Sequence, residues 1–167
     1  MPTYKAIAST TVGSGGASSI TFSSIPQTYT DLVIKLSTRS GFDWIRCQFN
    51  SSGGTAYSSR WLSGNGSSAG SGSSSGDSSA RATIVGQTDT ANTFGNAEVY
   101  IPNYTSSNYK SLSGDGVSEA NQTAAYAYLT ASLWSNTSAI TSITLTLENA
   151  GNFVQYSTAT LYGIKNS

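Results

Sequence analysis

A chain of 167 residues, of which only 10% are charged, is long enough for one sizeable core but poor in the charges that make up about 25% of an average soluble protein. Eight basic and eight acidic residues give a net charge of zero, so we expect no phosphate-binding surface and exclude nucleic acid as a partner. A net charge near zero also weakens the repulsion between copies and favours association.

Short strands separated by turn residues run through the chain. Alternation and turn residues predict strands at residues 4–11, 19–25, 30–38, 44–50, 57–62, 81–87, 97–101, 109–113, 123–134, 140–148 and 158–164. In the third of these, Leu32, Ile34 and Leu36 share one face, which is the two-residue period of a half-buried strand. The ten Tyr, five Phe and three Trp are typical of a folded β protein and not of a disordered chain.

The spacing of these segments indicates the fold class. About ten short strands at even spacing, with no sustained helical period, predict an all-β protein built as an antiparallel two-sheet β-sandwich. A jelly-roll-like arrangement is the favoured variety, and a single closed barrel is the competing one.

The segment at residues 63–79 is nearly all glycine and serine, a composition typical of a flexible linker. Its flanks both resemble further parts of the same β domain. We therefore expect a single β-sandwich domain over residues 1–167, with a Gly/Ser-rich loop at 63–79. Either its own domain or an adjacent subunit would hold this loop in place.

The polar inventory argues against an enzyme. The chain has no histidine, which excludes Ser-His-Asp and Cys-His arrangements and any zinc site that uses histidine. Its single cysteine, Cys47, falls on the same strand face as Ile45 and Phe49 and is expected to be buried. Most acidic residues fall in predicted turns or at strand ends, where they typically cap the backbone. We expect no catalytic residues, no metal and no cofactor.

Two readings of the strand at residues 123–134 stay open. One face carries Leu129 and Leu133 with several alanines, and the other carries Tyr126, Tyr128 and Trp134. If the alanine and leucine face lines the core, a row of aromatics points outward, as is common at protein interfaces. In the reverse orientation the aromatics belong to the core and the small-residue face is left for a partner. Periodicity does not choose between them.

A second aromatic group, Tyr100, Tyr104 and Tyr109, lies around a predicted turn. These tyrosines either bind a sugar by stacking and hydrogen bonds or anchor the loop to its own sandwich, and we favour the anchor. The residues predicted for an interface are Tyr126, Tyr128, Trp134, Trp44, Tyr100, Tyr104 and Tyr109.

The amino-terminal residues lack the charged start and long apolar run of a signal peptide. No stretch reaches the length of a membrane span, so no membrane partner is expected. We expect synthesis in the cytoplasm.

Several blocks of sequence resemble a known group of proteins. Residues 3–8, 19–26, 29–35, 101–104 and 160–165 are similar to segments of small virion proteins from tailed bacteriophages, marine ones in particular. The resemblance runs the length of the chain, and its first and last blocks are the most specific. It implies a β-sandwich on the outside of a phage particle, as a homotrimer, without distinguishing head from tail.

Two functions follow from that resemblance. The favoured one is a non-enzymatic capsid decoration or cement protein that binds over junctions of the major capsid protein, together with copies of itself, and stabilises the head. The alternative is a tail-fibre tip or head-fibre module that binds a host receptor or glycan through the tyrosine and tryptophan rows.

Overall fold

The computed structural model describes residues 3–41, 43–84, 90–119, 121 and 125–165. Positions 85–87 and 123–124 of two predicted strands lie outside the described residues. The strands are β1 (Thr3–Thr11), β2 (Ser19–Phe22), β3 (Asp31–Thr38), β4 (Trp44–Phe49), β5 (Tyr57–Gly64), β6 (Ala69–Asp77), β7 (Ala80–Ile84), β8 (Gly95–Ile101), β9 (Lys110–Ser118), β10 (Tyr126–Trp134), β11 (Ile143–Leu147) and β12 (Thr158–Lys165).

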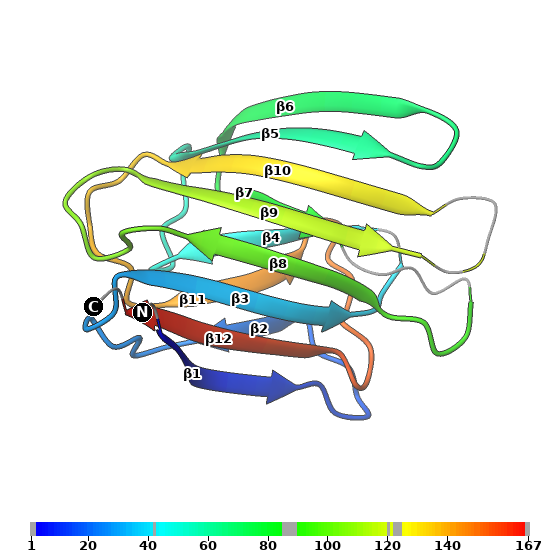
Figure 1. Ribbon diagram of the computed structural model, residues 1–167, viewed down its shortest axis with the longest axis horizontal. Helices are drawn as coiled ribbons and strands as arrows, with labels where there is room; N and C mark the ends of the chain where they lie inside the picture. Colours follow the sequence, from blue (N-terminus) through cyan, green and yellow to red (C-terminus); the bar gives the residue numbers. More distant parts are fainter. Residues whose placement is uncertain (1–2, 42, 85–89, 120, 122–124, 166–167) are drawn as a thin grey trace.

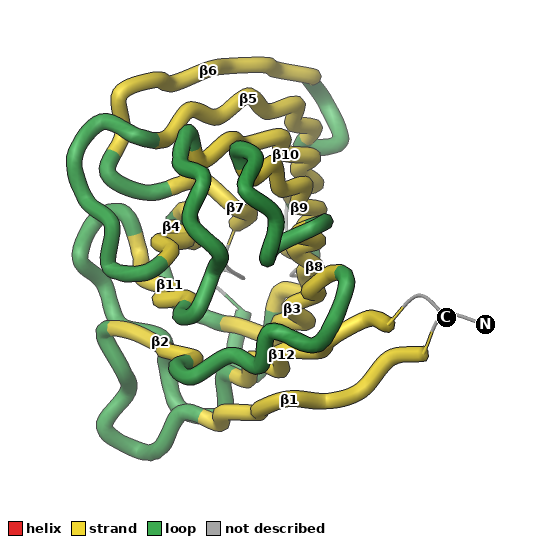
Figure 2. The backbone as a smooth tube through the Cα atoms, turned by 90° about the vertical axis from the view of Figure 1, so that its left-hand side faces the viewer, coloured by secondary structure: helices red, strands yellow, loops and turns green. Residues whose placement is uncertain are grey.

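The strands form two antiparallel sheets that face each other (Figures 1 and 2). The larger has eight strands in the order β1-β12-β3-β8-β9-β10-β5-β6, and the smaller has four in the order β2-β11-β4-β7. An all-β sandwich of two antiparallel sheets is therefore confirmed. The described residues form twelve strands where about ten were expected. The two sheets differ in their number of strands, and the jelly-roll-like arrangement stays a prediction.

The core lies between the sheets and is built by the alternation visible in the sequence. Leu32 and Ile34 of β3 are fully buried, and so are Ile143 and Leu145 of β11 in the opposite sheet. β3 lies third in the larger sheet, between β12 and β8, so its inward face is surrounded by other strands. Burial of such apolar side chains is the main favourable term in folding.

β7 lies unusually close to the larger sheet. At Gly114 of β9, an added Cβ atom would fall 1.8 Å from the carbonyl oxygen of Ala82. Thr130 Oγ1 of β10 donates to that same oxygen at 2.5 Å, and Ser132 Oγ donates to the carbonyl of Arg81 at 2.9 Å. Glycine and short hydroxyl side chains thus let β7 dock by hydrogen bonds to side chains across the sandwich.

The glycine- and serine-rich segment is a β-hairpin, so the predicted loop at residues 63–79 is wrong. β5 continues to Gly64, and β6 pairs with it along its length from Ala69 to Asp77. The turn closes because Asn65 Oδ1 accepts hydrogen bonds from the backbone N–H groups of Ser67 and Ser68, at 3.1 and 2.8 Å. Backbone pairing within its own domain therefore holds the segment, and β6 becomes one edge of the larger sheet.

Candidate interaction surface

The orientation of β10 decides which of its residues can reach a partner. Thr130, Ser132 and Trp134 are buried and face the smaller sheet, whereas Leu129 and Leu133 face solvent. The hydroxyl groups of the inner face are satisfied by β7, which removes the cost of burying them. The structure therefore has the second of the two orientations that the sequence left open, in which the aromatics face inward and the small-residue face is left outside.

Two predicted interface residues lie in the core. The Trp134 ring is 1% exposed, with its centroid 5.4 Å from that of Phe49 and 6.2 Å from that of Tyr57. Tyr104 is fully buried, and its hydroxyl donates to the carbonyl of Pro26. These large side chains fill the space between the sheets, so neither is placed to contact a partner.

Three more predicted residues form a half-buried aromatic cluster on the inner side of the sandwich. The Trp44 ring lies 4.9 Å from that of Tyr128, which in turn lies 6.3 Å from that of Tyr126. Trp61, a residue not predicted for a site, completes the cluster at 5.2 Å from Trp44. The guanidinium of Arg81 lies 5.2 Å from the Trp61 ring centroid, within cation–π range. This cluster joins the two sheets and does not form an outward row.

The last two predicted residues lie apart. The hydroxyl of Tyr100 donates to Asp31 at 3.0 Å, and burial, followed by this hydrogen bond, raises the pKa of Tyr100. Asp31 also accepts from the backbone N–H of Asn103 at 2.9 Å, so it fixes the turn after β8. This arrangement corresponds to the anchoring alternative. Tyr109 is 59% exposed on a loop. The predicted residues thus divide among the core, the aromatic cluster, strand β8 (Tyr100) and a loop (Tyr109).

The outer face of the larger sheet carries an apolar group that the predicted residues do not include. It spans β5, β10 and β9. The register of the strands makes its side chains neighbours, because Leu129 lies opposite Leu62 and Ala127 lies opposite Val117. We call this group the apolar strip, and its members are Leu62, Val117, Ala127, Leu129, Ala131 and Leu133. Leu62, Leu129 and Val117 are 59%, 55% and 46% exposed, large values for apolar side chains that adjoin one another.

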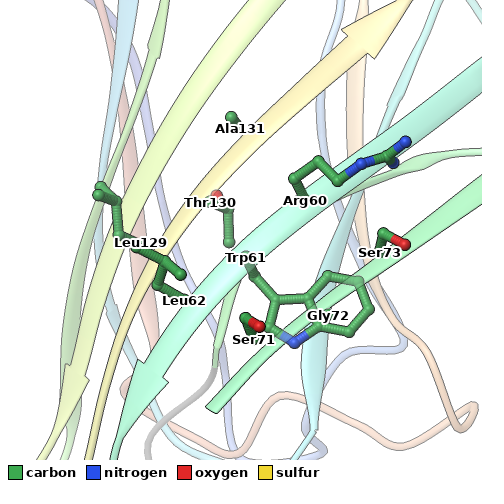
Figure 3. Close-up of a pocket in the computed structure, with 9 residues that line it drawn as sticks. All are labelled: Arg60, Trp61, Leu62, Ser71, Gly72, Ser73, Leu129, Thr130 and Ala131. Atoms are coloured by element: carbon green, nitrogen blue, oxygen red, sulfur yellow. The ribbon is translucent and has the colours of Figure 1, made fainter. Parts of the chain in front are cut away.

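Open hollows lie beside the protruding leucines. One lies between β6, β5 and β10, with Leu62 and Leu129 beside small residues such as Ser71 and Ala131 (Figure 3). A second lies next to Val117 and Ala127, and a third next to Ala131 and Leu133. The surface therefore alternates between large apolar side chains and spaces that can accept them.

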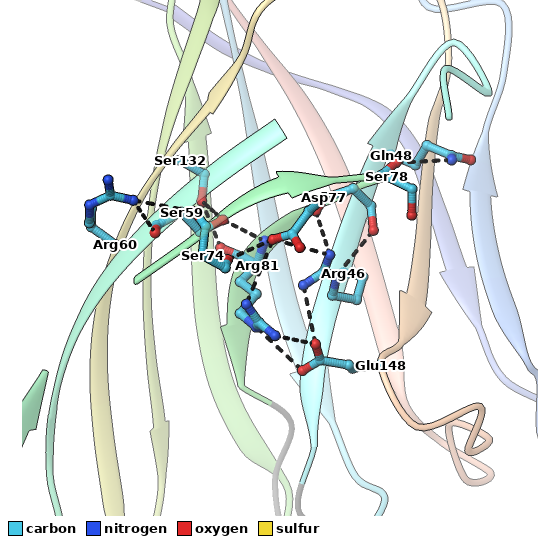
Figure 4. Close-up of polar contacts among 11 residues, drawn as sticks. Arg46, Gln48, Ser59, Arg60, Ser74, Asp77, Ser78, Arg81, Ser132 and Glu148 are labelled. Atoms are coloured by element: carbon cyan, nitrogen blue, oxygen red, sulfur yellow. Dashed lines mark hydrogen bonds and ion pairs between the residues drawn. The ribbon is translucent and has the colours of Figure 1, made fainter. Parts of the chain in front are cut away.

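Ion pairs hold the carboxyl end of β6 in place. Arg46 and Arg81 share the carboxylate of Glu148, and both also lie within ion-pair distance of Asp77 at the end of β6 (Figure 4). Arg46 Nη2 donates to the backbone carbonyl of Ser79 at 2.7 Å, and desolvation lowers the pKa of Arg46. The network binds β4, β6 and β7 together, which explains how a strand of glycine and serine stays attached.

No reactive centre is evident in the part of the chain that the structure describes. Cys47 is fully buried, and its pKa is raised by desolvation, the reverse of what a nucleophilic thiol requires. Within the described ranges, no three Cys, Asp or Glu side chains come together as a metal-binding group. The described ranges also contain no helix with the length and apolar character to cross a membrane.

Alkaline pH should destabilise the fold through two buried groups. Burial raises the pKa of Cys47 and of Tyr57 above their ordinary values of 9.0 and 10.0. Well below pH 9 both groups are protonated in the folded and in the unfolded state, so neither of them lowers the free energy of unfolding there. Above these values the unfolded chain ionises first, so each group lowers the free energy of unfolding by about 1.4 kcal/mol per pH unit. Urea denaturation followed by circular dichroism from pH 7 to 11 measures this fall. The slope between pH 9 and 10 should shrink in Cys47→Ala, and a flat profile to pH 11 would contradict the argument.

The fold and the surface together define this chain as an all-β sandwich protein with an exposed apolar strip on its larger sheet. Comparisons with protein families, with curated proteins and with solved structures found no match to it. A function must therefore be argued from its own residues.

Proposed function

We propose that this chain is a non-enzymatic structural protein of a bacteriophage virion: a capsid decoration or cement protein on the particle surface. It binds over junctions between subunits of the major capsid protein, next to copies of itself, and stabilises the head. The homotrimer and the virion location come from the sequence resemblance described above.

The observation that carries this proposal is the outer face of the eight-stranded sheet. It is broad, its central strands pair without a register shift, and it bears hydroxyl, amide and apolar side chains with few charges. Among its charged groups, Lys35 and Glu98 already pair with each other. Such a face suits lasting contact with other protein surfaces and offers no group for chemistry.

The stabilisation follows from binding linkage. A protein that binds the assembled shell but not the separated subunits shifts the equilibrium towards the shell, by an amount that grows with its concentration relative to the dissociation constant. A site over a subunit junction meets this condition because the junction exists only after assembly.

Heads with and without the protein provide the test. We expect heads that lack it to release their genome at a lower temperature, measured by the access of a DNA-binding dye during heating, and purified protein should restore the original temperature. Antibody-gold labelling should decorate heads. Label confined to tails, together with an unchanged release temperature, would rule out the proposal.

The alternative of a fibre module that binds a host glycan keeps less support. It relied on an outward row of aromatics, but Trp134 is buried and Tyr126, Tyr128 and Trp44 are half-buried on the inner side. A glycan array that binds the chain, with loss of binding in Tyr109→Ala, would favour this alternative.

A further inference from the structure

We infer that the apolar strip is the contact between copies of this chain, arranged around a symmetry axis that runs along β10. The inference names the surface for the self-association that the proposed function includes, but it does not depend on a virion location.

The strip offers apolar side chains that a second copy of the strip would cover. Its protruding side chains, Leu62, Leu129 and Leu133, stand beside hollows bordered by alanine, glycine and serine. When two such faces approach around an axis along β10, Leu129 and Leu133 meet the same residues of the other copy, and the β5 side faces the β9 side, as in the packing of two sheets about 10 Å apart. A two-fold pair uses the same patch on both subunits, whereas a ring of three joins one side of the patch to the other side on the next copy.

The charges beside the strip indicate how neighbouring copies are oriented. Arg60 on β5 lies opposite Ala131 of β10, and Asp115 on β9 lies opposite Leu129. The two charges therefore flank β10 on opposite sides, two residues apart along the strand, an offset of about 7 Å. Neither takes part in an ion pair among the described residues; the Arg60 guanidinium donates only to the backbone carbonyls of Ser59 and Ser74.

Symmetry brings these two charges together. When copies face one another around an axis parallel to β10, the β5 side of each copy meets the β9 side of its neighbour. Arg60 of one copy then lies near Asp115 of the next, within reach of a long arginine side chain. This holds for a pair and for a ring of three, because in both cases unlike sides of the strip meet.

The rest of the outer face stays free for another partner. The surface over β3, β12 and β1 lies at the other end of the sheet order from β5 and β6 (Figure 1). An oligomer built on the strip therefore leaves that region exposed for another partner, such as the capsid of the proposed function.

Sedimentation equilibrium of the purified full chain, from 1 to 200 µM, tests the inference. We expect the wild type to associate into a dimer or a trimer. Leu129→Lys places a charge in the centre of the strip and should weaken association by at least about 30-fold, the effect of losing a central contact residue. Ser37→Lys adds the same charge to the exposed outer face of β3, away from the strip, and should leave the mass unchanged.

Charge reversal supplies an independent test. Arg60→Asp and Asp115→Arg should each weaken association, and the double variant should recover most of the loss because the opposite charges meet again. Circular dichroism and the melting temperature establish that each variant is folded. A double variant no better than the singles would overturn the proposed orientation.

A wild type that stays monomeric to 200 µM, or equal effects of Leu129→Lys and Ser37→Lys, would overturn the self-contact itself. The failure of this inference and that of the proposed function are distinguishable. A monomer that still raises the release temperature of heads keeps the function and removes this contact. An oligomer that never binds heads keeps this contact and removes the proposed function.

Discussion

Gly114→Ala is expected to lower the free energy of unfolding by more than about 3 kcal/mol, above the usual range for overpacking. The new methyl group would meet the backbone oxygen of Ala82 at 1.8 Å and Thr130 Oγ1 at 2.7 Å. β9 cannot move aside, because it is paired with both β8 and β10. Moving β7 instead would break the hydrogen bond from Thr130 to Ala82. Urea denaturation followed by circular dichroism measures the loss.

Two further variants make this result specific. Gly53→Ala is the matched control: no heavy atom lies within 4 Å of its added Cβ, so we expect a change below about 0.5 kcal/mol. Gly116→Ala should fall between the two, because its obstacle at 2.1 Å is the side-chain oxygen of Thr83 and not backbone. If Gly114→Ala kept wild-type stability, β7 would not lie as close to β9 as described.

Trp134→Ala should lower the free energy of unfolding by about 3–5 kcal/mol, the range for removing a large aromatic side chain from a core. The indole packs against Phe49 and Tyr57, so its removal leaves a cavity in the core. Denaturation followed by far-UV circular dichroism is the measurement, since the substitution also removes a fluorescent group.

Trp134→Phe separates packing from hydrogen bonding. The indole Nε1 has no hydrogen-bond partner among the described residues, so phenylalanine loses volume but no bond. We expect a cost well below that of alanine. If Trp134→Ala instead kept full stability and lost binding to a partner, Trp134 would be a surface residue, as the first reading of β10 required.

The hairpin of β5 and β6 shows why the composition of residues 63–79 wrongly predicted a loop. A run of glycine and serine has little intrinsic preference for strand and usually marks a loop or linker. Here β5 supplies the backbone partner along the full length of β6, and Asp77 ties its end to Arg46 and Arg81. Glycine at position 72 also leaves room for the Trp61 ring, because an added Cβ would fall 2.3 Å from it. Tertiary contacts, absent from any local pattern, override the local preference.

Only part of the apolar strip could be predicted from the sequence. The alternation in residues 126–134 separates Leu129 and Leu133 from the aromatics, and one of its two readings leaves the leucine face for a partner. Leu62 and Val117 join them only because β5 and β9 both pair with β10 in a particular register. These residues are 67 and 12 positions from Leu129 in the chain, and pairing between strands is not encoded in local periodicity.

The sequence by itself determined the all-β class, the sites of most strands and the burial of Cys47, because a two-residue alternation and turn residues are local properties. Only the tertiary structure decided which face of β10 is inside, since both faces are apolar enough to line a core. The decision rests on the small residues Gly114, Thr130 and Ser132, which admit and hydrogen-bond β7. Because the aromatics of β10 pack on the inner side, its leucine face lies outside. The exposed apolar surface follows from that packing.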